Sequence, residues 1–182
     1  MAGFANIHIP PELAEAVILG DREASGRLFQ LLSPAVLSVA WRMLGSRSAA
    51  DEILQDVFMQ VLDRAATIVH PSALLGWVRT VAINQCLMRL RSPWSLRRAL
   101  DEAEEVPDAL EGEDRMGGIS DLERMLARLQ PETRMVVWLH DVEGYTHREI
   151  GDLMGKTPSY SKSQLSRAYE FLLTHWQSQN EK

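Results

Sequence analysis

The chain of 182 residues contains a single cysteine, Cys86, so it can form neither an internal disulfide nor a zinc site built from several thiolates. No apolar run reaches the roughly 18 residues that a membrane-spanning helix requires. The first residues lack the basic start and long apolar centre of an export signal. Alternation of polar and apolar residues is not sustained anywhere, which argues against a sheet. These absences favour a cytoplasmic, helical protein.

The charges are distributed unevenly along the chain. The net charge is −6 and the isoelectric point about 5.4, values that at first argue against a nucleic-acid partner. Residues 71–100, however, contain five arginines and no acid, whereas residues 101–114 contain eight acids and no base. The distribution of charge is a better guide to partners than its sum. We therefore expect a basic surface followed by a solvated acidic segment.

Apolar residues recur at helical spacing on both sides of that segment. They predict helices over residues 12–19, 21–44, 48–66, 73–90, 121–129 and 131–142, with Pro34 bending or dividing the second and Ser48, three residues before Asp51, capping the third. The apolar stripes of the helices include Phe29, Leu62 and Tyr169. We predict an all-α fold of two small helical domains, residues 1–94 and 121–182, joined by a flexible acidic linker over residues 95–120.

The stretch of residues 144–176 predicts two helices joined by a tight turn. Thr146 and Glu149 have the spacing of a capping box. Gly155 can end the first helix in a left-handed conformation. Thr157 and Pro158 are typical of the start of a second helix. This pattern indicates a helix-turn-helix that binds DNA, although an ordinary helical hairpin with a solvated face would share it.

The second of these helices has a polar and basic outer side. Lys162 and Arg167 suit phosphates or guanine, and the serines and Gln164 suit base edges or the DNA backbone. Tyr160 is expected near the exposed edge. The candidate DNA contacts are therefore Ser159, Tyr160, Lys162, Ser163, Gln164 and Arg167.

Four segments, in this order, resemble the sigma-70 family of RNA polymerase subunits, in the small two-domain extracytoplasmic-function (ECF) class. ADEILQDVF (50–58) is similar to the helix that docks on the polymerase clamp, and WVRTVAINQCLMRLR (77–91) to the helix that melts and reads the −10 promoter element. LARLQPETRMVVWLHDVEGYTHREIGDLMG (126–155) and KSQLSRA (162–168) are similar to the reader of the −35 element and its recognition helix. The set resembles the family over about residues 20–95 and 120–175.

The resemblance implies an initiation factor that binds core RNA polymerase and promoter DNA, catalyses no bond chemistry itself and needs no cofactor or metal. An anti-sigma factor is a common partner in this class. The family pattern assigns polymerase binding to Asp51, Glu52, Gln55 and Asp56. It places Asn84 where an asparagine holds an extruded base, with Arg79 and Val81 beside it and Arg89 and Arg91 at phosphates. Ala49 departs from the pattern, because the docking motif usually begins with an aspartate there.

Two other functions fit parts of the sequence. A stand-alone helix-turn-helix regulator would bind duplex DNA without polymerase, but would not require the arginine-rich helix around Asn84 or a separate acidic docking helix. A protein-interaction module could retain the fold alone. An enzyme is disfavoured, because His140 and Asp141 are accompanied by no nucleophile elbow or oxyanion loop. A gel shift with and without core polymerase separates these readings.

Overall fold

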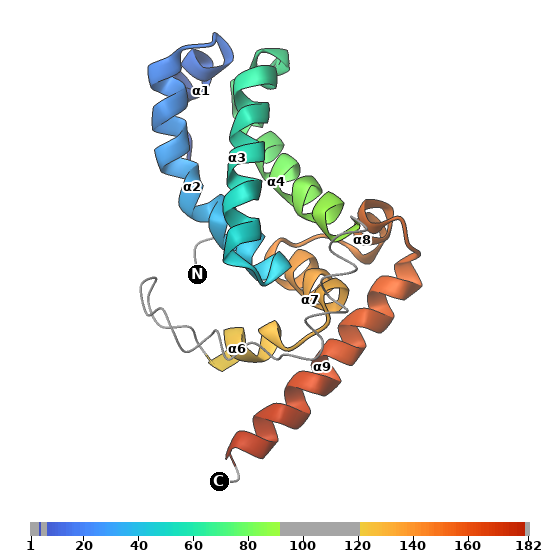
Figure 1. Cartoon of the computed structure of the whole chain (residues 1–182). Helices are drawn as coiled ribbons and strands as arrows, with labels where there is room; N and C mark the ends of the chain where they lie inside the picture. The colour runs from blue at the N-terminus through green and yellow to red at the C-terminus, as the bar shows by residue number, and fades with distance from the viewer. Residues whose placement is uncertain (1–3, 5–6, 92–120, 181–182) are drawn as a thin grey trace. The chain divides into compact units, whose positions relative to one another are not determined.

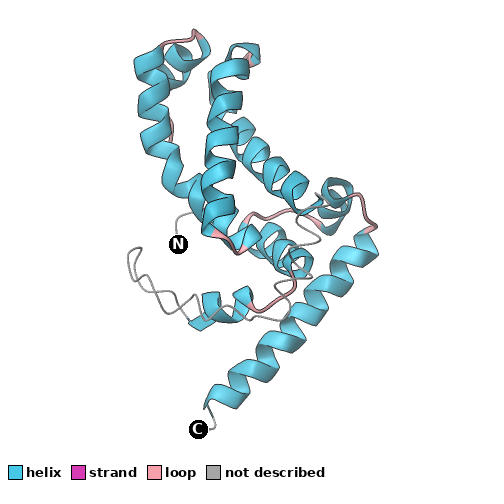
Figure 2. Cartoon of the chain, viewed as in Figure 1, coloured by secondary structure: helices cyan, strands magenta, loops and turns pink. Residues whose placement is uncertain are grey.

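The computed structural model describes residue 4 and residues 7–91 and 121–180, and the side chains of residues 121–123 and 176–180 are left out of the description. Within this part the regular elements are all helices (Figure 2), as predicted. The predicted acidic linker, residues 95–120, lies outside the described residues. The chain divides into two compact units, Met1–Leu87 and Met88–Lys182, with the boundary inside the fourth helix.

The first unit is built on two long helices that lie side by side (Figure 1). These are α2 (Arg22–Leu44) and α3 (Arg47–Arg64), and α1 (Pro11–Ile18) packs on α2. Two short 3-10 turns, Ala65–Thr67 and Pro71–Ala73, lead into α4 (Leu74–Arg91). The core holds fully buried apolar side chains from the three longest helices, namely Leu28, Leu32, Val36, Val39, Met43, Val57, Val61, Leu74, Val78 and Ile83.

The ends of these helices follow local rules with one exception. Asp21 caps α2 by accepting a hydrogen bond from the Ala24 amide at 2.8 Å, and Gly45 ends it at φ 73°. The cap of α3 lies two residues earlier than predicted, because Ser46 rather than Ser48 accepts a hydrogen bond from the Ala49 amide, at 3.3 Å. Helix α2 runs unbroken through the exposed Pro34, so this proline does not divide it.

Three side chains predicted to be inward are exposed, and each has a local reason. Phe29 lies 42 % exposed at the rim of the core, where its ring makes a T-shaped contact with that of the buried Phe58 and the ring centroids are 4.7 Å apart. Leu62 is 69 % exposed because it lies on the side of α3 opposite the buried Val57 and Val61. Tyr169 is 43 % exposed, since its hydroxyl donates to the carboxylate of Asp141 at 3.0 Å.

The second unit is organised around one long helix. Helices α6 (Asp121–Ala127), α7 (Pro131–Val137) and α8 (His147–Met154) all contact α9 (Pro158–Asn180), and α7 continues into a wide π turn over Trp138–Val142. The guanidinium of Arg134 is buried, which lowers its pKa to about 10, and its Nη1 donates to the Ala127 carbonyl at 3.0 Å. The apolar core comprises Met135, Val136, Leu139, Ile150, Met154, Leu165 and Ala168.

The turn between α8 and α9 forms as predicted. The Thr146 amide donates to Glu149 Oε2 at 2.8 Å and the Glu149 amide donates to Thr146 Oγ1 at 3.3 Å, which closes the capping box and lowers the pKa of Glu149. Gly155 has φ 64°, and the Tyr160 amide donates to Thr157 Oγ1 at 3.1 Å. Gly151 allows the close approach of the turn, because a Cβ there would meet the Lys156 carbonyl oxygen at 2.9 Å.

The single cysteine is buried, and the described residues contain neither a helix suited to a membrane nor a metal-binding cluster. Cys86 is free and lies inside the first unit, where burial raises its pKa to about 12. Among the described helices, none combines the length and apolar character that crossing a membrane would take. In the same residues no group of three or more histidine, cysteine or acidic side chains is arranged to hold a metal ion.

Candidate nucleic-acid and polymerase interfaces

The outer side of α9 carries most of the predicted DNA contacts. Ser159, Lys162, Ser163 and Arg167 are exposed there. The Ser163 hydroxyl donates to the Ser159 carbonyl at 2.9 Å, so one of the two serines bonds to its own helix. The basic side chains at 162 and 167 are left toward solvent. This side of the helix can therefore present two cations and small hydroxyls to a nucleic acid.

Tyr160 lies at the edge of this side, as predicted. Its ring is partly buried and its hydroxyl donates to the carboxylate of Glu132 on α7. Burial, followed by the hydrogen bond to Glu132, raises the pKa of Tyr160 to about 12. The ammonium of Lys156 lies 5.4 Å from the ring centre. The phenol is thus neutral at physiological pH and held against α7.

Gln164 differs from the other predicted DNA contacts because it faces inward. It is 9 % exposed, and its Oε1 accepts a hydrogen bond of 2.6 Å from the hydroxyl of Thr133, which is 8 % exposed. The side chain thus bonds to α7 instead of facing solvent, so it is not placed to contact DNA. Sequence spacing missed this because both helix faces carry polar residues at this point.

A second polar residue on α9, Ser161, also faces inward, which the sequence pattern did not predict. Ser161 is fully buried and its Oγ lies 3.0 Å from Nδ1 of His147 on α8. The ring of His147 stacks on that of His140 at 4.5 Å, and Nδ1 of His140 lies 2.8 Å from Asp141 Oδ1. Burial first, then the neighbouring His140 and Lys162, lowers the pKa of His147.

This cluster is not arranged as a hydrolase triad. The hydroxyl of Ser161 is buried and out of reach of a substrate. The carboxylate of Asp141 contacts His140, whereas the serine contacts the other imidazole, His147. The order of nucleophile, base and orienting acid that a triad requires is therefore broken.

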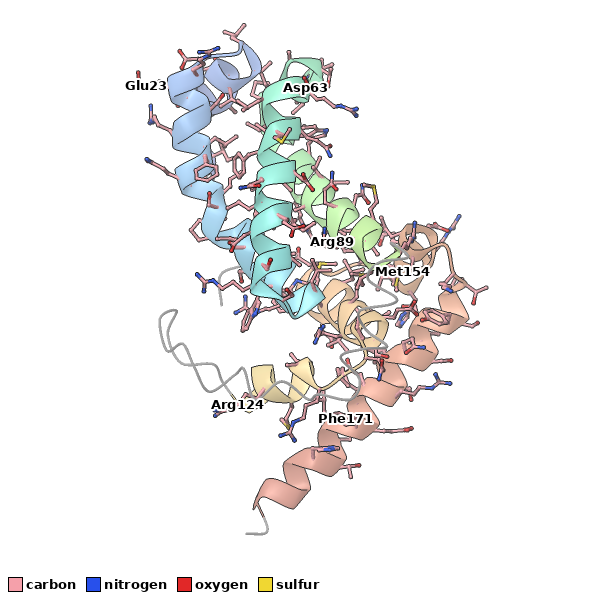
Figure 3. The ribbon with its side chains drawn as sticks, viewed as in Figure 1. Glu23, Asp63, Arg89, Arg124, Met154 and Phe171 are labelled. Atoms are coloured by element: carbon pink, nitrogen blue, oxygen red, sulfur yellow. The ribbon has the colours of Figure 1, made fainter. Side chains whose placement is uncertain are left out.

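The predicted −10 contacts lie along α4. Asn84 and Arg91 are exposed, Arg79 and Arg89 are half-buried, and Val81 is buried at the boundary of the core. Figure 3 labels Arg89 near the end of this helix. The first turns carry no acid, and Arg89 and Arg91 lie in the last turn, where cations also complement the helix dipole. An exposed amide with arginines before and after it suits a nucleic-acid backbone and one extruded base.

The predicted polymerase contacts share one side of α3. Asp51, Glu52, Gln55 and Asp56 are all exposed there, opposite the buried Ile53 and Val57. The same side continues into two exposed apolar residues, Met59 and Leu62, and then Asp63, which is labelled in Figure 3. An acidic surface with an apolar end can bind a basic partner that also offers an apolar patch.

Known proteins resemble both units. The protein-family model described as sigma-70 region 2 matches residues 28–95, and the family model described as sigma-70 region 4 matches residues 119–172. The ECF RNA polymerase sigma factor SigM of Mycobacterium tuberculosis is 27% identical over 171 residues, which cover 91% of this chain and 85% of SigM. RNA polymerase sigma factor CarQ of Myxococcus xanthus is 28% identical, over 84% of this chain and 89% of CarQ.

A solved structure shares the fold. The sigma factor RpoE of Bartonella quintana, solved in complex with the anti-sigma factor NepR, aligns with a TM-score of 0.52 and 19% identity. The alignment covers 81% of this chain and 92% of RpoE.

Proposed function

Because the chain belongs to the sigma-70 family of RNA polymerase sigma factors, in its ECF class, we propose that its two helical domains, residues 1–94 and 121–182, read two separate promoter elements while the chain is bound to core RNA polymerase. Residues 95–120 connect them. The observation that carries this proposal is the presence of both family regions, in order, on one chain. A stand-alone regulator accounts for the second region but not for the first.

The second domain reads the −35 element through the outer side of α9. The contact set is Ser159, Tyr160, Lys162, Ser163 and Arg167, four of which are exposed and one partly buried. Arg167 and Lys162 offer charge-assisted bonds to phosphate or guanine. The capped turn before α9 supports this function, because it fixes where the helix starts.

The first domain opens and reads the −10 element through α4. Asn84 bonds to an extruded base, with Arg79 beside it, Val81 beneath, and Arg89 and Arg91 at phosphates. Extruding a base costs about a few kcal/mol of lost stacking, which contacts to that base must offset. The exposure of the Asn84 amide on a helix without acids supports this role.

The exposed acidic side of α3 docks on the polymerase. Asp51, Glu52, Gln55 and Asp56 offer charge complementarity to a basic surface, which mainly sets the orientation and rate of association. We also propose an anti-sigma partner, by analogy with the RpoE complex, and a cytoplasmic location, where the polymerase works. The protein acts by binding, not as an enzyme.

The division of labour can be tested by transcription in vitro with core polymerase, followed by mapping of start sites. Arg167→Ala should weaken binding to the −35 element, and Asn84→Ala should impair strand opening, measured by permanganate reactivity, while leaving −35 contacts intact. Arg128→Ala and Gln30→Ala, at exposed positions outside the proposed contact sets, serve as controls.

Two results would contradict the proposal. One is equal loss of both activities from either variant. The other is selection of the same DNA sites by the purified chain without polymerase, which would favour a stand-alone regulator.

A further inference from the structure

The first two turns of α9, which carry most of the residues proposed to meet DNA, are attached to their domain by polar side chains. From residue 159 to residue 164 the two buried side chains are Ser161 and Gln164, and buried apolar residues begin only at Leu165. Tyr160, partly buried, adds a hydrogen bond to Glu132. These two turns therefore rest on hydrogen bonds, and the buried apolar residues of α9 start at Leu165, two residues before Arg167.

The two buried bonds reach two different helices. Thr133 on α7 donates to Gln164 at 2.6 Å, and His147 on α8 lies 3.0 Å from Ser161. Ser161 and Gln164 are three residues apart, so they lie on the same side of α9. Contacts from one side of a helix to two neighbouring helices fix its rotation as well as its position.

Directional bonds limit the rotation of a helix more strictly than apolar contacts do. Apolar burial is non-directional, whereas a hydrogen bond weakens steeply once its angle departs from linearity. A rotation of about 20° moves a side-chain end lying ~5–6 Å from the helix axis by ~2 Å. Base recognition needs placement to within about 0.5 Å. A small rotation that leaves the fold intact would therefore change which base edges Lys162 and Arg167 can reach.

From these contacts we propose that Thr133 and Gln164, together with His147 and Ser161, are positioning residues that set the rotation of α9 and thereby the promoter selectivity of the chain. The inference rests on the proposed −35 role of α9. None of the four side chains needs to touch DNA. They act through the exposed residues of the same helix.

The variants separate positioning from simple stabilisation. Thr133→Val and Gln164→Leu each leave a buried polar group without its partner and should destabilise the domain. The double variant Thr133→Val/Gln164→Leu removes both polar groups and should recover a melting temperature near that of the natural protein. Thr133→Ser keeps the hydroxyl and serves as the conservative variant. Thr174→Val, which removes a hydroxyl that donates to the Glu170 carbonyl of α9 itself, is the matched control.

The readout is discrimination between −35 sequences by the full chain bound to core polymerase. Start sites are first mapped with the natural protein, and transcription is then compared between the best promoter and versions with single base changes in the −35 element. The folded double variant should lose about tenfold in discrimination, the scale of one misplaced base contact, with unchanged polymerase affinity. Thr133→Ser and Thr174→Val should keep the natural discrimination between −35 sequences.

The outcomes distinguish this inference from the proposed function. A folded double variant with natural discrimination would overturn the positioning role while leaving the sigma function standing. A natural protein that directs no start sites with core polymerase would instead overturn the proposed function. Should the double variant fail to fold, the comparison of Thr133→Val with Thr133→Ser at equal folded fractions decides: equal discrimination contradicts the inference and a loss in the first alone supports it.

Discussion

The two helices proposed to contact DNA are held in place by different means. Helix α4 buries apolar side chains from Leu74 to Leu87, with Val78 and Ile83 among them. The first two turns of α9 instead bury two polar side chains, Ser161 and Gln164. Packing of apolar volume makes α4 sensitive to cavities, whereas paired polar groups make α9 sensitive to unmatched partners. Helices with similar tasks can thus differ in which substitutions damage them.

The largest effect that this comparison predicts is a cavity under α4. Ile83→Ala removes most of a side chain that is 1% exposed and should lower the free energy of unfolding by about 2–5 kcal/mol. Urea unfolding followed by circular dichroism measures it. Met88→Ala, at an exposed position of the same helix, should change stability by less than about 0.5 kcal/mol. Equal losses from the two would mean that α4 does not depend on packing.

A smaller effect tests the turn before α9. In Gly151→Ala the added Cβ would meet the backbone of Lys156 at 2.9 Å and of Pro158 at 3.1 Å, and such overpacking costs about 1–3 kcal/mol. Gly26→Ala, where nothing lies within 4 Å of the added atom, should instead stabilise α2 by about 0.5–1 kcal/mol. Thermal unfolding of both variants shows whether each substitution raises or lowers stability. A neutral Gly151→Ala would show that the turn can move away, and that the start of α9 is loosely fixed.

Removing the cap of α3 should have an intermediate effect on the free energy of unfolding. Ser46→Ala removes the hydroxyl that accepts from the Ala49 amide and should cost about 1 kcal/mol. Ser48→Ala removes an exposed hydroxyl inside the first turn and should cost little. Chemical denaturation of the two variants side by side compares them. The reverse ranking would restore Ser48 as the cap and move the start of α3.

The smallest predicted effect is a pH dependence confined to the second unit. The pKa of His147 is lowered by burial, by His140 and by Lys162, against the opposing charge of Asp141. The unfolded chain therefore binds a proton at this histidine at higher pH than the folded chain does. The contribution of His147 to stability is thus fully present above the ordinary histidine pKa of about 6.5, and stability falls as the pH drops below it.

Melting temperatures between about pH 5.5 and 7.5, a range that spans the ordinary histidine pKa, measure this loss. His147→Gln should flatten the slope, and His70→Gln, at an exposed position of the first unit, should leave it unchanged. If the melting temperature still falls with pH after the His147 substitution, other groups cause the pH dependence and His147 does not.

Features set by neighbours in sequence could be predicted, and features set by neighbours in space could not. The capping box of Thr146 and Glu149 and the turn at Gly155 depend on residues a few positions apart, and the structure confirms them. Gln164 and Ser161 were missed because their partners, Thr133 and His147, belong to other helices. The prediction of Ser48 as the cap of α3 was wrong, because the spacing to Asp51 that favoured Ser48 does not exclude Ser46, which also precedes the apolar stripe.

The state of Cys86 has a practical consequence. Its thiol is enclosed and has a pKa of about 12, and the thiolate is the form that reacts with maleimides and disulfides. A fluorophore can therefore be attached to a cysteine introduced on the surface, for instance by Gln30→Cys, without first replacing the natural one. Light emitted by such a probe would report assembly with other macromolecules from a site of the experimenter's choosing.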